Sequence, residues 1–409
     1  MQRFFMGHAD VQTKISFLAI VLVCFSPIFW WEPGYYILGS DLDYSFDSIE
    51  RFWERFFLWD TVLLGGVDRT NNVASLPFIG LLALIQRVFG LEFGQIVFFS
   101  LILLFNALSF RFLLSQVVPG DFKLKQLLFF IATVFVIGSI YNCFLWLRLN
   151  INTVSLGFIC LFWGGAMRFL NNPRRKVKED FLLFVVLVGS GASIGIQPPL
   201  IFNLIIFSII LFFPINGLRS SFRYLARLVL WMGLFTCCSL FWILPLAAFI
   251  GFNFNDPSLG ATHYSVETLL GWVSDRTSLI TVLTGIADAP WLSSWGGMWY
   301  WEYGENLRHD VLFSLAASII LFFTLVGLTE SIGRNQSRWA LIFLLSSFLS
   351  MGIHFPFNEL YAFLIEYVPG FWIQRAPWQK FAMFSLISQG VLICIGAKKL
   401  LGLAWEFNK

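Results

Sequence analysis

Charged residues are scarce in this sequence of 409 residues. Only 12% are Asp, Glu, Lys or Arg, whereas 58% are hydrophobic, and a soluble domain carries about 25% charged residues. A chain of this composition cannot cover itself with polar groups in water, which excludes a soluble globular fold. In lipid every backbone N–H and C=O must be paired within the chain, which favours helices. The sequence therefore predicts an all-α polytopic membrane protein.

Two further absences limit the chemistry. Cysteine occurs six times, always inside apolar segments and without the spacing of a disulfide framework or a metal site. Neither GxxxxGK[ST] nor GxGxxG occurs, and the basic loops are too short to hold a nucleotide-binding domain. We therefore expect no direct use of ATP or a nucleotide sugar and no nucleic-acid partner. The activated substrate should come from the membrane.

Ten apolar runs are predicted to be transmembrane helices. They lie at 15–31, 94–114, 126–147, 153–170, 181–196, 199–213, 228–250, 311–329, 339–353 and 381–397. An eleventh run, at 73–90, contains Pro77, Gln86 and Arg87. If it crossed the bilayer, the basic cluster at 174–178 would lie outside, against the positive-inside rule. We interpret 73–90 as a surface or re-entrant helix, which gives ten spans and places both termini in the cytoplasm. The pair 181–196 and 199–213 is alternatively a broken hairpin.

This topology places three long loops outside, at 32–93, 251–310 and 354–380. They contain most of the 24 acidic residues. Polar outer loops on a membrane scaffold are where such a protein would keep its chemistry. We expect a single domain, 1–409, in a bacterial or archaeal-type plasma membrane, with an extracytoplasmic site.

An amphipathic helix is predicted in the first outer loop. Charged residues recur at helical spacing from Asp47 to Arg55, and Phe52 and Trp53 fall on the opposite face. A helix with one charged and one aromatic face lies flat on a bilayer surface. The first outer loop should therefore contain surface helices that follow the first span.

Two carboxylates precede that helix. Asp41 and Asp43 are two residues apart, so in an extended segment their side chains point the same way. Such a pair can hold a divalent cation, Mg²⁺ or Mn²⁺, or one member can take a proton from an acceptor hydroxyl. The simpler alternative is a pair of solvated residues at a helix start.

The order of short motifs in this region resembles a known enzyme class. The motifs are PGYYILGSDLDY at 33–44, FLWD at 57–60 and SLPFIGLL at 75–82. They resemble the N-terminal membrane region of GT-C type glycosyltransferases, nearest to the mycobacterial α-(1→3)-arabinofuranosyltransferase group and its YfhO-like relatives. The resemblance implies a GT-C-like bundle with an essential acidic residue in the first outer loop. It makes Asp41 the first choice for the catalytic base and Asp43 the alternative, and it assigns Asp60 to substrate binding.

A second match lies at 368–381, VPGFWIQRAPWQKF. This segment is similar to the P…R-x-P-x-K-F segment of the same families, with one residue added before the lysine. Arg375 and Lys380 lie there at the outer membrane edge, where Arg binds phosphate bidentately and Lys as a point charge. Snorkelling of two basic side chains at a helix end is the alternative.

The loop at 251–310 supplies further candidates. Trp299 and Trp301 can stack on sugar rings, while Glu302 and Glu305 can accept hydrogen bonds from sugar hydroxyls. An interfacial belt of aromatic residues explains the same tryptophans. Nearby, the candidates for binding the donor phosphate are Arg308 and His309.

The resemblance implies transfer of a sugar from a polyprenyl-phosphate donor to a hydroxyl of a glycan, lipid or protein. The reaction would invert the anomeric centre and serve cell-envelope synthesis, with a divalent cation as the only cofactor to consider. One alternative is a flippase or transporter for lipid-linked sugars, although transporters usually keep their charged residues near the bilayer midplane. The other alternative is an inactive membrane scaffold of an envelope complex.

Overall fold

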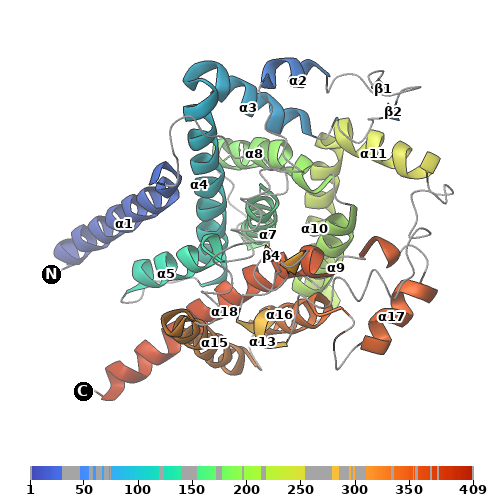
Figure 1. Cartoon of the computed structure of the whole chain (residues 1–409). Helices are drawn as coiled ribbons and strands as arrows, with labels where there is room; N and C mark the ends of the chain where they lie inside the picture. Colours follow the sequence, from blue (N-terminus) through green and yellow to red (C-terminus); the bar gives the residue numbers. More distant parts are fainter. Residues whose placement is uncertain are drawn as a thin grey trace. The chain divides into compact units, whose positions relative to one another are not determined.

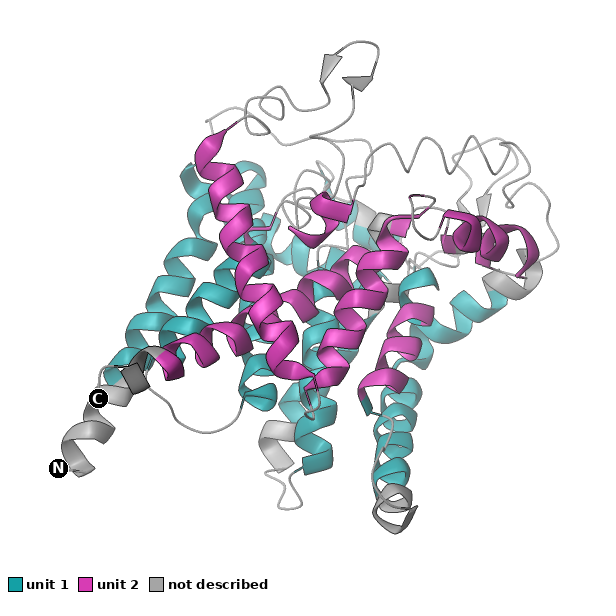
Figure 2. Ribbon diagram, turned by 90° about the horizontal axis from the view of Figure 1, so that it is seen from below, with its two compact units in different colours: residues 1–137, 145–201, 212–252 teal, residues 138–144, 202–211, 253–409 magenta. Residues whose placement is uncertain are grey.

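The computed structural model shows a helical protein (Figure 1). It describes residues 2–29, 47–54, 59–60, 67–68, 73, 75–118, 124–139, 154–171, 177–195, 198–212, 218–253, 279–284, 294–295, 298–299, 310–332, 336–352, 354, 358–368, 371–374 and 377–407. Two β-ladders of two residues per strand are the only non-helical regular structure in these ranges. The chain forms two compact units, coloured separately in Figure 2.

The first unit comprises residues 1–137, 145–201 and 212–252. Its elements are α1 (Gln2–Cys24), η1 (Ser26–Phe29), α2 (Ser48–Glu54), β1 (Trp59–Asp60), β2 (Val67–Asp68), α3 (Leu76–Phe89), α4 (Leu91–Val117), α5 (Lys125–Ile137), α7 (Ser155–Asn171), α8 (Val177–Gly195), α10 (Leu218–Cys238) and α11 (Leu240–Asn253).

Glycines bring α7 directly against α4. A Cβ on Gly157 would lie 2.5 Å from the Phe105 ring, and a Cβ on Gly164 would lie 2.9 Å from the Phe112 ring. Small residues allow this close approach between membrane helices. The side chain of Asn106, inside α4, accepts a hydrogen bond of 2.9 Å from the Gly157 N–H. An otherwise unpaired N–H in the first turn of α7 is thereby satisfied.

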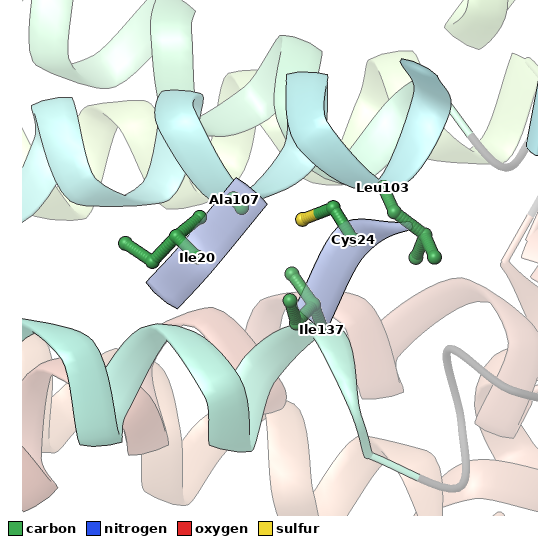
Figure 3. Packing of buried hydrophobic residues seen from close by; sticks show 5 residues of the cluster. All are labelled: Ile20, Cys24, Leu103, Ala107 and Ile137. Carbon is green, nitrogen blue, oxygen red and sulfur yellow. The ribbon is translucent and has the colours of Figure 1, made fainter. Parts of the chain in front are cut away.

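An apolar cluster joins α1, α4 and α5. Ile20 and Cys24 of α1 pack with Leu103 and Ala107 of α4 and with Ile137 of α5, all at most 1% exposed (Figure 3). The three helices therefore share a dry contact region within the first unit.

The second unit comprises residues 138–144, 202–211 and 253–409. Its elements are most of α9 (Pro198–Phe212), then α13 (Leu279–Leu283), β3 (Ser294–Trp295), β4 (Met298–Trp299), α15 (Val311–Ser331), α16 (Ser337–Ser350), α17 (Asn358–Tyr367), η5 (Phe371–Gln374) and α18 (Pro377–Phe407).

The helix α18 packs closely on α15 and α16. A Cβ on Gly327 of α15 would lie 2.0 Å from the Leu392 carbonyl oxygen, and a Cβ on Gly396 would lie 2.3 Å from the Phe323 carbonyl oxygen. On the side of α16, the buried hydroxyls of Ser347 and Ser385 lie 2.7 Å apart. Both contacts depend on small residues, as is usual between helices in lipid.

Several helices are long and apolar enough to cross a bilayer, which indicates a membrane-embedded protein. In the described part of the chain they are Val11–Phe29, Leu91–Val117, Val311–Ser331 and Lys380–Leu403. The pair α10 and α11 would make a fifth. These five coincide with five of the ten predicted spans.

The predicted span at 228–250 is not one straight helix. The chain bends by 78° between α10 and α11. At the bend the Ser239 N–H bonds to two carbonyls, those of Phe235 at 3.0 Å and Thr236 at 3.1 Å. Pro245 further weakens α11, since it has no N–H to donate. The sequence prediction of a span at 228–250 gave no sign of this break, because apolarity alone does not reveal one.

Candidate functional site

A buried amide network holds the segment that leads into α18. The side-chain N–H of Gln374 donates to the Asn203 side-chain oxygen at 2.9 Å, and the Asn203 amide donates to the Lys380 carbonyl at 3.1 Å. Asn203 is 1% exposed and Gln374 is fully buried. Because a buried amide without partners is costly, these hydrogen bonds tie Gln374, just before α18, to Lys380 in the first turn of α18 through Asn203. We call Asn203, Gln374 and Tyr361 the amide platform.

Tyr361 of α17 completes the amide platform. Its hydroxyl donates to the Gln374 carbonyl at 2.7 Å, and its ring meets the Phe371 ring edge-on with centroids 5.6 Å apart. Burial raises the pKa of the Tyr361 phenol well above its ordinary value. The phenol therefore stays protonated and keeps donating over the physiological range of pH.

The platform contacts the chain immediately before Arg375 and at the backbone of Lys380, the two predicted phosphate-binding residues. Gln374 immediately precedes Arg375, and Lys380 lies in the first turn of α18 with a partly buried side chain. Arg375 itself lies outside the described residues, as do seven other predicted site residues. Those seven are Asp41, Asp43, Trp301, Glu302, Glu305, Arg308 and His309.

Two predicted substrate-binding residues lie in the short ladders. Asp60 of β1 pairs with Val67 of β2 in the first unit. Trp299 of β4 pairs with Ser294 of β3 in the second unit. Both residues therefore have defined backbone positions in small antiparallel hairpins, although helices were the only elements expected.

The region predicted as the second outer loop contains the helix α13, which lies beside α18. Gln389 donates a hydrogen bond of 2.7 Å to the Leu283 carbonyl at the end of α13, and a weaker one of 3.4 Å to the Thr324 hydroxyl. Gln389 lies nine residues after Lys380, about 14 Å along α18. Val282 of α13 also packs on Met351. The helix α13, part of the region predicted as the outer loop 251–310, thus contacts α18 well inside the length of that helix.

The helix α2, which was predicted to lie on the membrane surface, packs on α3. The Asp47 carboxylate caps α2 by accepting from the N–H groups of Ile49 and Glu50, at 3.0 and 2.9 Å. The Ser48 N–H bonds to the Gln86 side chain at 2.9 Å. A Cβ on Gly80 would lie 2.9 Å from the Phe52 ring, so α2 lies directly on α3. These contacts fix the start of α2, which in the sequence follows Asp41 and Asp43 by a few residues.

An apolar cavity of about 290 Å³ opens in the first unit between α3, α4 and α8. Phe78, Phe105 and Val186 line it together with Ser193. The Ser193 hydroxyl is buried and has no hydrogen-bond partner in the described part of the chain. The walls suit a hydrocarbon chain, with one polar group available.

No group of three His, Cys, Asp or Glu side chains among the described residues is placed to hold a metal ion. Comparisons of the chain with protein-family profiles, curated proteins and solved structures found no match.

Four residues of these networks had no role in the sequence prediction: Asn203, Tyr361, Gln374 and Gln389. A lone amide within an apolar run was the available signal for Asn203 and Gln389, since polar groups in a span are usually functional.

Proposed function

We propose that the protein is a GT-C type glycosyltransferase that transfers a sugar from a polyprenyl-phosphate donor to a hydroxyl acceptor. In this proposal ten spans surround an active site on the extracytoplasmic face. The amide platform is the observation that carries it. The buried side chains of Asn203, Tyr361 and Gln374 hold the chain just before Arg375 and at Lys380. Basic residues that only extend to the membrane surface need no such support.

Each proposed site residue has a distinct task. Asp41, or alternatively Asp43, removes the proton of the acceptor hydroxyl as it attacks the anomeric carbon. Arg375 and Lys380 hold the phosphate that leaves, where cations fixed in place stabilise the developing charge. Arg308 and His309 assist on that phosphate.

The acceptor and the transferred sugar need their own contacts. In the proposal these come from Asp60, Trp299, Trp301, Glu302 and Glu305. A single displacement inverts the anomeric centre. A divalent cation between Asp41 and Asp43 would act on the donor phosphate, so the assay includes a chelator arm with Mg²⁺ or Mn²⁺ restored.

The test is sugar transfer by the purified chain in lipid nanodiscs, with a panel of radiolabelled polyprenyl-phosphate sugars and cell-envelope acceptor. Asp41→Asn or Asp43→Asn should lower the rate by about 10²- to 10⁴-fold. Arg375→Gln should lower it by about 10²-fold or more. Arg227→Gln is the matched control, because Arg227 donates to the Leu170 carbonyl at 3.2 Å, outside the proposed site. Unchanged transfer in all variants would refute the assignment of roles.

A lipid-linked sugar flippase is the second candidate, favoured by the bend between α10 and α11. Broken helices at membrane depth are typical of transporters. At this bend the Ser239 hydroxyl and the Trp242 indole N–H are buried without a hydrogen-bond partner among the described residues. Both groups are available to a polar ligand.

One comparison separates the two functions. Vesicles with the reconstituted protein and a fluorescent short-chain polyprenyl-phosphate sugar report its movement between leaflets. Movement without any transfer to acceptor, lost in a Ser239→Ala variant, would support the flippase. Neither movement nor transfer would leave a scaffold as the working hypothesis.

A further inference from the structure

Arg111 is a charged residue inside a membrane span. It lies in α4, six residues before Val117, and its side chain is partly buried. Its guanidinium donates to the Ser16 hydroxyl of α1 at 2.7 Å and to the side-chain oxygen of Gln126 in α5. Ser16 in turn donates to the Gln126 backbone carbonyl at 3.2 Å. Three helices thus converge on one cation.

Both partners of this cation are neutral. In the described part of the chain no carboxylate bonds to Arg111, whose described partners there are Ser16 and Gln126. Two other arginines differ, because Arg227 and Arg338 donate to the carbonyls of Leu170 and Leu211 near the ends of α7 and α9. Helix C-termini carry partial negative charge, which compensates a cation.

The helix end beside Arg111 carries partial positive charge, unlike the partially negative helix ends beside Arg227 and Arg338. Gln126 is the second residue of α5, and a helix N-terminus carries partial positive charge. A guanidinium has five N–H donors in a planar fork, and the two described bonds leave donors over. The site therefore has a positive charge and spare donors with no anion in the described residues to match them.

The depth of the site matches a lipid headgroup. Six residues of helix place Arg111 about 9 Å from the end of α4. Ser16 lies five residues into the apolar span that starts at Val11, and Gln126 is the second residue of α5, so all three residues lie near one membrane face. The positive-inside rule assigns this face to the cytoplasm, where the leaflet carries anionic lipids.

Apolar side chains continue from the site toward the membrane interior. Leu18 and Leu22 of α1 are 58% and 64% exposed, and Leu127 and Ile131 of α5 are both 47% exposed. Beneath them the cluster of Ile20 and its neighbours joins the three helices (Figure 3). An acyl chain can lie along this flank while its headgroup stays at Arg111.

We propose that Arg111, held by Ser16 and Gln126, binds the phosphate of an anionic phospholipid at the junction of α1, α4 and α5. Arg recognises phosphate through paired charge-assisted hydrogen bonds. Basic sites between membrane helices on the cytoplasmic side are known to bind anionic headgroups. The site is independent of the proposed sugar transfer, and its lipid would support the fold of the first unit.

The test is native mass spectrometry of the full chain in detergent with phosphatidylglycerol or phosphatidylcholine. The wild type should retain phosphatidylglycerol more tightly. Arg111→Gln should weaken phosphatidylglycerol by about tenfold or more, the loss expected for one charge-assisted hydrogen bond, and should weaken phosphatidylcholine much less, because its choline cation offsets the phosphate charge. Arg227→Gln removes an equal charge at a compensated site and should bind like wild type.

Gln126→Glu keeps the test decisive if Arg111→Gln does not fold. This nearly isosteric change gives Arg111 a carboxylate partner, so the helix contacts remain while the phosphate preference is lost. Equal binding of both lipids by the wild type would overturn the proposal, and so would full phosphatidylglycerol binding by Gln126→Glu. Displacement of phosphatidylglycerol by inorganic phosphate would instead assign the site to a free anion and would also overturn the lipid site.

Discussion

At the scale of single residues, the amide platform makes Asn203 more important for stability than its size suggests. Asn203→Leu removes the partner of Gln374, whose amide stays buried. An unpaired buried polar group costs about 1–3 kcal/mol, so the free energy of unfolding should fall by about that amount. Equilibrium unfolding in mixed detergent measures it. If Asn203→Leu lowered the free energy of unfolding no more than Asn203→Gln does, the amide platform would have no stabilising role.

Tyr361 gives the platform a dependence on pH. Burial raises the pKa of its phenol above 10 in the folded protein. The folded state then holds the proton more tightly than the unfolded chain, so this stabilisation is complete below about pH 10 and is lost as pH rises toward the folded pKa.

Tyr361→Phe tests this linkage. The variant should lose about 1 kcal/mol at neutral pH, the net value of one hydrogen bond, while the ring contact with Phe371 remains. Above pH 10 the difference from wild type should shrink. Unfolding titrations of both proteins at pH 8 and at pH values above 10 supply the comparison, and a difference constant with pH would argue against it.

The sequence could single out Asn203 but not its partners. It is the one Asn in the apolar run 199–213, which already suggests a polar contact. Its partner Gln374 lies 171 residues away, and nothing in local spacing connects the two. Arg375 was noticed because of its charge, whereas the neutral Gln374 beside it carried no comparable signal.

At the scale of elements, the contact between α15 and α18 depends on two glycines. Gly327→Ala would place a methyl group 2.0 Å from a backbone carbonyl oxygen of α18. Because backbone cannot move aside cheaply, the helices must separate, at a cost of about 1–3 kcal/mol. The thermal unfolding midpoint should fall.

Gly402→Ala, in the partner helix α18, is the matched control for Gly327→Ala. Among the described residues nothing lies within 4 Å of a Cβ at Gly402, and alanine favours a helix over glycine by about 1 kcal/mol. This variant should keep or raise the midpoint. Similar midpoints for the two variants would show that the close contact does not hold α15 against α18.

The helices were easier to predict than their interruptions. Long apolar runs predicted α4, α15 and α18, because a run of that length has few other folds in lipid. The bend at Ser239 was missed, since its residues are as apolar as the rest. The ladders were also missed, although the Gly-Gly pair between β3 and β4 in the sequence is a recognised hairpin signal.

At the scale of the whole molecule, the direction of every later span depends on whether α3 crosses the bilayer. Its 14 residues extend about 21 Å, less than the roughly 30 Å hydrocarbon core. Length alone does not decide, since α5 and α16 are equally short.

The charged helix α2 argues against a crossing by α3. It lies on α3 from Gly80 to Gln86, and its Glu50 and Glu54 are exposed. If α3 crossed, these carboxylates would face lipid, which costs about 2.5–3.5 kcal/mol or more for a charged residue at the centre of the membrane. At the interface they face water while Leu84 and Val88, 59% and 65% exposed, face the bilayer.

Cysteine labelling of the full chain without its native cysteines tests the resulting topology. With α3 at the surface, a membrane-impermeant maleimide added to intact cells should label Asp60→Cys, but Arg175→Cys and Arg334→Cys only after the cells are opened. If α3 crosses, every later segment inverts, and Arg175→Cys becomes labelled from outside. That result would also move Arg375 and Lys380 to the cytoplasmic face, away from Asp41. The proposed active site could then no longer form on one side of the membrane, so the labelling pattern decides the topology and the feasibility of sugar transfer together.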